Sequence, residues 1–391
     1  MLSPLPTERH TAGSMTRTGE LALVMSGGGA RAAYQVGALR WIARRFPGLD
    51  VPILTGVSAG AINAAFLGVY PDPLPERVEK LCDLWRNLAV EDVFRVGALG
   101  LFTHMVESGM ALVSGGHFRP KHHGMVDTSP LRAFLGRALC ARDGELVGVA
   151  ENLGKNAVRA VAVTAASYTT GRSVTFVQGR DIEPWERADR VCRTTLLRVE
   201  HIMGSAALPI FFPAVQIENG FYGDGGMRLT APLAPAVHLG AGKVLAISTR
   251  HVHDMAETRM HVLKGYPPPA QIFGDVMSAI FLDQFDGDAL RLERINQLLR
   301  DLPPEKRGQL RPVELLLLRP SRDLGRLAND YEARLPRTFR FLTRGLGTRQ
   351  TRTNDLISLV MFQPDYLRRL LELGEEDAAE RAADIERFLG G

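Results

Sequence analysis

Residues 21–69 read LALVMSGGGARAAYQVGALRWIARRFPGLDVPILTGVSAGAINAAFLGV, and this stretch decides the fold. The apolar run Leu21 to Met25 ends in three glycines, and Ala30 to Phe46 follows with apolar residues at helical spacing. Val51 to Val57 has the composition of a second buried strand, and the alanine-rich segment Ala59 to Val69 continues from it as a second helix. The unit of strand, turn and helix therefore occurs twice in succession.

The alternation of strands and helices continues along the chain. Helical patterns cover Ser129 to Cys140 and Pro232 to Leu239. Further strand-like runs lie at Val158 to Ala165, Ser173 to Val177, Lys243 to Ser248 and Val313 to Leu318. This order predicts an α/β fold, a three-layer α/β/α sandwich built around a mostly parallel central sheet.

The remaining segments are predicted from weaker patterns. Gly97 to Gly124 has little periodicity and is expected to be a long loop or cap. Ala270 to Arg300 has the pattern of one long amphipathic helix. Beyond Arg319 the chain becomes rich in arginine, and helices are predicted at Asn354 to Leu373 and Glu375 to Leu389, which together form a C-terminal helical extension.

Composition limits the classes of function. The chain has 391 residues, 45% of them hydrophobic, and a net charge of +4, which is too weak to indicate nucleic-acid binding. Residues 1–20 hold no apolar run of signal-peptide length, and no window reaches the roughly 18 apolar residues of a spanning helix, so we expect a cytoplasmic protein with at most peripheral membrane contact. Three cysteines, predicted to be buried thiols, indicate a reducing compartment: Cys82, Cys140 and Cys192.

Gly56-Val57-Ser58-Ala59-Gly60 fits the G-x-S-x-G pattern of a nucleophile elbow. In such an elbow a serine sits on a tight turn between a strand and a helix, and small neighbours let the backbone adopt strained angles. The predicted strand before Ser58 and the helix after it supply that context. The alternative is an ordinary glycine-bounded turn with a capping serine.

The glycines at 27–29 leave successive backbone N–H groups without side chains at a helix N-terminus, where an oxyanion could be held. Gly27, Gly29 and Ala32 also satisfy the G-x-G-x-x-G/A pattern of a dinucleotide loop. A dinucleotide site needs an acidic residue at the end of the second strand. Asp50 has the right separation but precedes the strand.

Gly223-Asp224-Gly225-Gly226 offers a carboxylate in a glycine-rich turn, and a nucleophilic serine needs such a base to take its proton. Taken alone, the tripeptide is common turn chemistry. The glycines would allow the carboxylate to approach Ser58 closely.

Together, these three motifs, in this order, resemble the patatin-like phospholipase family, which includes plant patatins and domains of the cytosolic phospholipase A2 type. The resemblance covers residues 21–242 and includes Ser205-Ala206-Ala207-Leu208-Pro209 ahead of the Asp-Gly-Gly turn. It implies a Ser-Asp dyad, with Ser58 as nucleophile and Asp224 as base, acting on a lipid ester without metal or organic cofactor. The family's other site positions correspond to three sets of residues in this sequence. Gly56 and Gly60 would flank the nucleophile elbow, and Gly225 and Gly226 would form the turn after the aspartate. The oxyanion loop would consist of Gly27, Gly28, Gly29, Ala30 and Arg31.

Composition, local patterns and the resemblance together predict a division of the chain into three parts. Residues 1–20 would be a disordered tail, residues 21–320 a patatin-like hydrolase domain, and residues 321–391 the helical extension. The sequence departs from the family at Ala32, where glycine is usual, and at Thr230-Ala231-Pro232, where Asn-x-Pro is frequent. A non-catalytic regulatory or scaffold protein of the same fold therefore stays open as a second hypothesis.

Histidines and arginines leave three further possibilities open. His238, His251, His253 and His261 follow Asp224 in the order of a conventional Ser-Asp-His triad. A loop with His117, His122 and His123 could suggest a metal, but no carboxylate or cysteine spacing supports one. A basic surface near the C-terminus, which includes Arg334, Arg337, Arg340, Arg344, Arg349 and Arg352, is compatible with an anionic membrane or with a solvated helix face.

Overall fold

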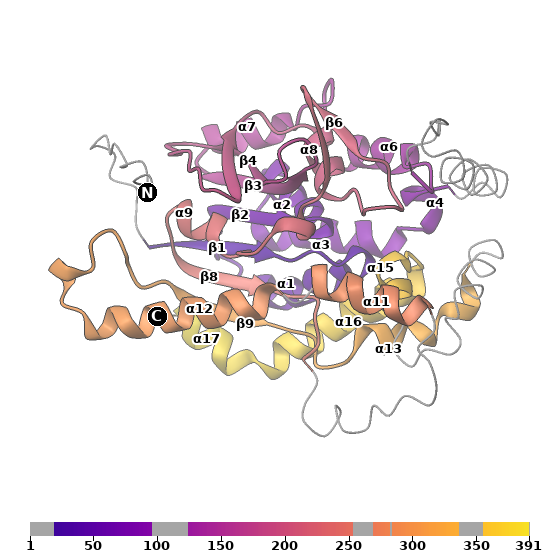
Figure 1. The fold of residues 1–391 in the computed structure, drawn as a ribbon. Helices are drawn as coiled ribbons and strands as arrows, with labels where there is room; N and C mark the ends of the chain where they lie inside the picture. The colour runs from indigo at the N-terminus through magenta and orange to yellow at the C-terminus, as the bar shows by residue number, and fades with distance from the viewer. Residues whose placement is uncertain (1–18, 96–123, 253–268, 282–283, 336–354, 391) are drawn as a thin grey trace.

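One nine-stranded sheet forms the centre of the computed structural model, which describes residues 19–95, 124–252, 269–281, 284–335 and 355–390. The main path of the sheet has the order β5-β4-β3-β2-β1-β8-β9, and the hairpin β6-β7 joins it through β3 (Figure 1). The strands are β1 Glu20–Met25, β2 Ile53–Val57, β3 Ala160–Ser167, β4 Ser173–Gly179, β5 Arg190–Thr194, β6 Val215–Ile217, β7 Gly220–Asp224, β8 Ala241–Ile247 and β9 Glu314–Leu318.

The centre of the sheet is parallel. β1 pairs in parallel with both β2 and β8, β2 with β3, and β8 with β9. Antiparallel pairing occurs where β3 meets β4 and β7. The predicted mostly parallel α/β sandwich is therefore confirmed, and its parallel strands place their carboxyl ends at one edge, where ligands bind in such folds.

Helices cover both faces, because residues along each central strand alternate between two cores. In β1, Leu23 and Met25 pack into the larger core, whereas Ala22 and Val24 face the smaller one. On the larger side lie α1 Ala33–Arg45, α2 Ala59–Val69, α3 Leu74–Asn87, α4 Val90–Val93, α6 Ser129–Ala138, α7 Val147–Gly154, α8 Val199–Ser205, α13 Leu324–Asn329, α15 Asp355–Val360 and α16 Pro364–Glu380. The smaller side holds α9 Ala234–His238 and α12 Gln284–Asp301, whereas α11 Pro269–Phe281 and α17 Ala382–Gly390 contribute buried residues to the larger core.

Several expectations need correction. The predicted helix from Asn354 to Leu373 is two helices, α15 and α16, since Pro364 begins a new helix and disfavours helical geometry in the residue before it. The stretch from Ala270 to Arg300 forms α11 and α12 on either side of residues 282–283, which are not described. Cys140 is exposed just beyond α6, not buried, while Cys82 and Cys192 are buried as expected. Residues 97–123 of the predicted loop or cap lie outside the described residues.

The C-terminal helix α16 packs directly on α1 at a glycine crossing. A Cβ at Gly37 of α1 would lie 1.9 Å from the carbonyl oxygen of Leu371, and one at Gly374 would lie 2.1 Å from the carbonyl oxygen of Tyr34. Both distances are far shorter than a carbon–oxygen contact, so each helix backbone occupies the space that a side chain on the other would need. The close approach therefore depends on glycine at both positions.

We expect Gly37→Ala to lower the free energy of unfolding by about 1–3 kcal/mol, because the added methyl forces α1 and α16 apart. Gly136→Ala is the matched control, since a Cβ at this glycine of α6 meets nothing within 4 Å. That change should leave stability equal or raise it by about 0.4–1 kcal/mol. Urea unfolding of both variants checks this, and equal stability of the two would show that the crossing is looser than described.

Candidate active site

Ser58 occupies a sharp turn between β2 and α2. Its backbone angles, φ 55° and ψ −128°, are rare for a residue with a side chain and mark local strain. A Cβ at Gly56 would lie 2.2 Å from the carbonyl oxygen of Gly60, and one at Gly60 would lie 2.4 Å from that of Met25. The turn therefore requires both flanking glycines and presents Ser58 at the carboxyl edge of the sheet.

Ser205 fixes the backbone of this turn. Its hydroxyl accepts a hydrogen bond of 2.9 Å from the backbone N–H of Ser58 and donates one of 2.6 Å to the carbonyl oxygen of Thr164. Ser205 is fully buried at the end of α8. Sequence reasoning placed Ser205 only in a stretch of small residues and missed this role, because the contact joins residues 147 positions apart.

Asp224 ends β7, the strand that pairs antiparallel with β3. Its backbone N–H donates to the carbonyl oxygen of Ala207 at 2.9 Å, and its carboxylate accepts a hydrogen bond of 2.9 Å from the N–H of Gly226. A Cβ at Gly225 would lie 2.1 Å from the carbonyl oxygen of Thr164. The glycine turn thus lets the carboxylate lie tightly against the end of β3.

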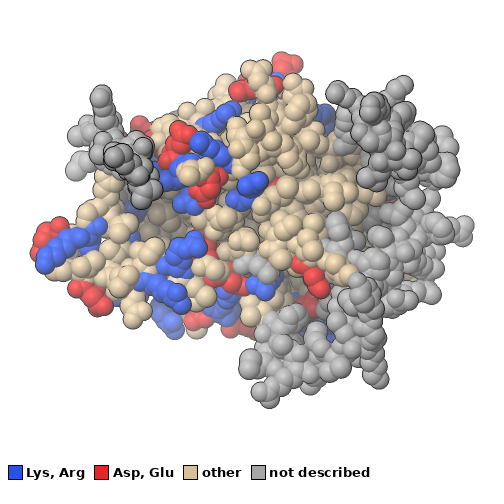
Figure 2. All heavy atoms as spheres, viewed as in Figure 1, with Lys and Arg blue, Asp and Glu red and all other residues tan. Residues whose placement is uncertain are grey.

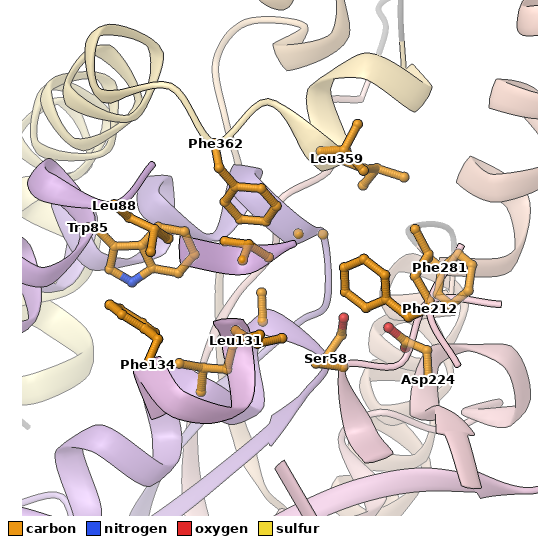
Figure 3. A pocket seen from close by; sticks show the side chains of 18 of the residues that line it. Ser58, Trp85, Leu88, Leu131, Phe134, Phe212, Asp224, Phe281, Leu359 and Phe362 are labelled. Carbon is orange, nitrogen blue, oxygen red and sulfur yellow. The ribbon is translucent and has the colours of Figure 1, made fainter. Parts of the chain in front are cut away.

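The side chains of Ser58 and Asp224 face one another at one end of a pocket (Figure 3). Asp224 is 1% exposed, and burial raises the pKa of its carboxyl to about 7, although the Ser58 hydroxyl and the Gly226 amide act in the opposite direction. No hydrogen bond of normal geometry reaches its Oδ2 from the described residues. Ser58 and Asp224 therefore face one another without a hydrogen bond of normal geometry to this oxygen, and such contacts can tighten when a substrate binds.

The glycine loop lies directly beside Ser58. A Cβ at Gly27 would lie 3.1 Å from the Cβ of Ser58. Gly28 and Gly29 have φ of 143° and 54°, and no described residue accepts a hydrogen bond from either backbone N–H. Ala30 and Arg31 follow in the short 3₁₀ helix Gly29–Ala32. These amides are placed where they could hold a negative oxygen next to the serine.

A buried hydrogen-bond network supports the base of this loop. The side-chain amide of Gln35 donates to the carbonyl oxygen of Ser26 at 2.9 Å, and Asn63 donates to Gln35 at 3.1 Å. The indole N–H of Trp85 donates to Asn63 at 2.8 Å. Gln35 and Asn63 are fully buried, and neither was singled out from the sequence, because a lone amide residue in a helix carries no motif.

The pocket that begins at Ser58 and Asp224 is apolar along its length (Figure 3). Its enclosed cavity has a volume of about 60 Å³, which is below the roughly 300–1,000 Å³ typical of small-molecule sites. Figure 3 shows Phe212 and Phe281 near the two polar side chains, and Trp85 and Phe134 toward the other end. Leu84, Leu88, Leu131, Leu359, Val360 and Phe362 also line it.

Two histidines that could have completed a Ser-Asp-His triad have other neighbours. His238 stacks on Trp185 with ring centres 4.8 Å apart, and burial lowers its pKa to about 4. The Nδ1 atom of His251 lies 3.0 Å from the carbonyl oxygen of Pro320. His253 and His261 lie outside the described residues.

Dinucleotide binding and metal binding receive no structural support. Asp50 precedes β2 and so lies at the opposite end of that strand from the glycine loop, which removes the acidic partner of a dinucleotide site. No group of three potential metal ligands occurs among the described residues, and His117, His122 and His123 lie outside them.

Of the predicted basic surface only Arg334 is described, and it pairs with Asp365.

None of the helices in the described ranges is both long and apolar enough to cross a membrane.

Comparison with the curated proteins finds no sequence match. Similar solved structures include VipD from Legionella pneumophila, with 11% identity and a TM-score of 0.38, covering 94% of this chain and 67% of that one. Human GIVD cytosolic phospholipase A2 in complex with methyl gamma-linolenyl fluorophosphonate has 13% identity and a TM-score of 0.45, covering 95% of this chain and 59% of that one.

The type III effector ExoU, from Pseudomonas aeruginosa, has 13% identity and a TM-score of 0.36, covering 94% of this chain and 53% of that one. This chain therefore spans about half the length of ExoU and about six tenths of the human enzyme.

The family model for patatin-like phospholipase matches residues 23–237, which is more than half of the chain. The matched range holds the glycine loop, Ser58 and Asp224, and it confirms the resemblance found over residues 21–242. The chain belongs to the patatin-like phospholipase family.

Proposed function

We propose that the protein is a serine lipid acyl-hydrolase in which Ser58 is the nucleophile and Asp224 its base. Membership of the patatin-like phospholipase family supports a lipid hydrolase. The observation that carries the dyad is the position of Asp224, a buried carboxyl with its pKa raised to about 7, facing a strained serine at one end of an apolar pocket. A base of this pKa can accept a proton at neutral pH.

In the proposed reaction the Oγ of Ser58 attacks the carbonyl carbon of the ester while Asp224 takes the hydroxyl proton. The tetrahedral intermediate collapses, the alcohol leaves with the proton from Asp224, and the acyl group stays on Ser58. Water then attacks this acyl-enzyme, again giving its proton to Asp224. The fatty acid leaves, and Ser58 recovers its proton.

The amides of Gly28 and Gly29 would hold the negative oxygen of both tetrahedral intermediates. The support is that each N–H lacks an acceptor among the described residues and that the loop lies against Ser58. A single donor of this kind typically contributes about 10²–10³-fold to kcat.

The pocket supports a substrate with a fatty acyl chain, of the phospholipid or lysophospholipid kind. Its lining beyond Ser58 and Asp224 consists of aliphatic and aromatic side chains with no charged group, which suits a hydrocarbon chain.

Figure 2 shows basic and acidic side chains interspersed over the described face. Peripheral membrane contact remains part of the proposal, and Ile210, which is 64% exposed two residues before the pocket residue Phe212, is one apolar side chain available for it.

Ser58→Ala should abolish hydrolysis of p-nitrophenyl esters and labelling by a fluorophosphonate probe, because the nucleophile is gone. Asp224→Asn should lower kcat by about 10³-fold, since the proton then has no acceptor. His238→Ala and His251→Ala are the controls and should keep wild-type kcat, and a combined variant that adds His253→Ala and His261→Ala extends the comparison to all four candidates.

Circular dichroism of every variant checks that the fold is intact. Loss of activity in the folded histidine variants would favour a triad over the dyad. A wild type that neither hydrolyses esters of any chain length nor reacts with the probe would instead favour a non-catalytic scaffold protein.

The activity should also depend on pH through Asp224. Because the carboxylate form is the base, kcat/KM should rise with pH and level off above an apparent pKa near 7. Asp50→Asn is the control, since this carboxyl also has a pKa raised by burial but lies at the far end of β2. A pH profile of wild type that rises instead near pH 4, the usual range of a carboxyl, would contradict the assignment.

The stability of the folded protein should also depend on pH through Asp224. Between about pH 4 and 7 the folded state keeps the Asp224 proton that the unfolded state releases, so the contribution of Asp224 to stability falls as pH rises through this window, by up to about 4 kcal/mol. Asp224→Asn removes this loss and should gain stability relative to wild type between pH 4.5 and pH 8. Urea unfolding at both pH values measures it. Asp365→Asn, an exposed carboxyl, should show no comparable gain.

A further inference from the structure

Arg31 follows the glycine loop directly, and its charged head is buried among residues from the C-terminal part of the chain. Its side chain is 4% exposed. Its Nε donates a hydrogen bond of 2.7 Å to the hydroxyl of Ser358, and its Nη2 lies 2.5 Å from Oδ1 of Asp355. A charge at this depth is stable only with such partners, so Arg31 and α15 are tied together.

Asp355 is itself held in place by further contacts. Its Oδ2 accepts a hydrogen bond of 2.7 Å from the hydroxyl of Ser278 on α11, and its backbone oxygen accepts one of 2.6 Å from Ser358. Gly325 of α13 borders the ion pair, since a Cβ there would lie 2.5 Å from Oδ1 of Asp355 and 3.3 Å from Nη2 of Arg31. Residues of three helices, α11, α13 and α15, therefore contact the Arg31–Asp355 pair.

The helix that carries Asp355 also touches the loop backbone. A Cβ at Gly29 would lie 2.0 Å from the carbonyl oxygen of Leu359. Leu359 and Val360, the last residues of α15, line the same pocket as Ser58. On the opposite side, the hydroxyl of Thr249 donates to the carbonyl oxygen of Gly27 at 2.7 Å. The loop is thus clamped between the end of β8 and α15.

Glycines at positive φ have wide conformational freedom, so the direction of their amides must be fixed by neighbouring groups. Building on the proposed function, we propose that Asp355 is a positioning residue that acts through Arg31 to align the amides of Gly28 and Gly29 with the oxyanion. The catalytic loop of the family domain is then completed by a helix that lies more than a hundred residues beyond the matched range.

The test compares Asp355→Ala with Asp365→Ala on a p-nitrophenyl ester. Both variants break an ion pair in the same C-terminal segment, but Asp365 of α16 pairs with Arg334 on the surface, away from the pocket. Asp355→Ala should lower kcat about 10-fold or more while KM changes less than about 3-fold, because misaligned amides weaken the transition state and leave acyl binding intact. Asp365→Ala should keep both constants.

A second variant avoids an unpaired buried charge, in case Asp355→Ala does not fold. Gly325→Ala pushes a methyl group into the Arg31–Asp355 pair, while alanine favours the helix. Gly287→Ala of α12 is its control, since a Cβ there meets nothing within 4 Å. We expect Gly325→Ala to lower kcat and slow fluorophosphonate labelling of Ser58 by about 10-fold, at temperatures where circular dichroism shows that this variant and Gly287→Ala are both fully folded.

Wild-type kcat in folded Asp355→Ala or Gly325→Ala would overturn the inference. A loss of kcat that merely follows a raised KM and a lowered thermal midpoint would also overturn it, because it would show a role in folding alone. Hydrolysis that survives Ser58→Ala would overturn the proposed function itself. Hydrolysis that disappears with Ser58→Ala but is unchanged by Asp355→Ala would overturn this inference and leave the dyad standing.

Discussion

The burial of one carboxyl group beside one strained serine is the constraint on which the rest of the structure depends. Removing Asp224 from water disfavours its charged form, and the protein compensates with only one described hydrogen bond to that side chain, from Gly226. The antiparallel strand β7 brings the carboxyl to the end of β3, while the parallel strand β2 brings Ser58 to the same edge. A sheet with both kinds of pairing is therefore needed to bring the two side chains together.

The elements that sequence reasoning predicted are those defined by local pattern. The bounds of α2 were predicted without error, because an alanine-rich helix follows a glycine elbow with no linker. β1, β2, β3, β4, β8 and β9 were each predicted from runs of apolar residues, whereas β5, with Arg190 and Arg193 in five residues, carries no such run. The short hairpin β6-β7 was missed too, although its last residue, Asp224, was singled out by its turn.

The parts of the site that sequence reasoning missed depend on contacts between distant residues. Ser205, Gln35 and Asn63 make hydrogen bonds to residues distant in the sequence, which no spacing rule describes. The contact between Arg31 and Asp355 joins residues 324 positions apart, and its acidic partner stands in a short helix that was predicted as part of a longer one. The local pattern thus located Ser58 and Asp224, while the residues that contact their surroundings became visible only in three dimensions.

The position of α15 has a consequence for how the protein is made. Ribosomes synthesise the chain from its N-terminus, so the glycine loop, Ser58 and Asp224 all emerge well before Leu359 and Val360, which form the pocket wall beside them. A partly synthesised chain therefore contains Ser58 and Asp224 without part of the pocket lining around them. The pocket is complete only after α15 has been synthesised and has packed against the earlier part of the chain.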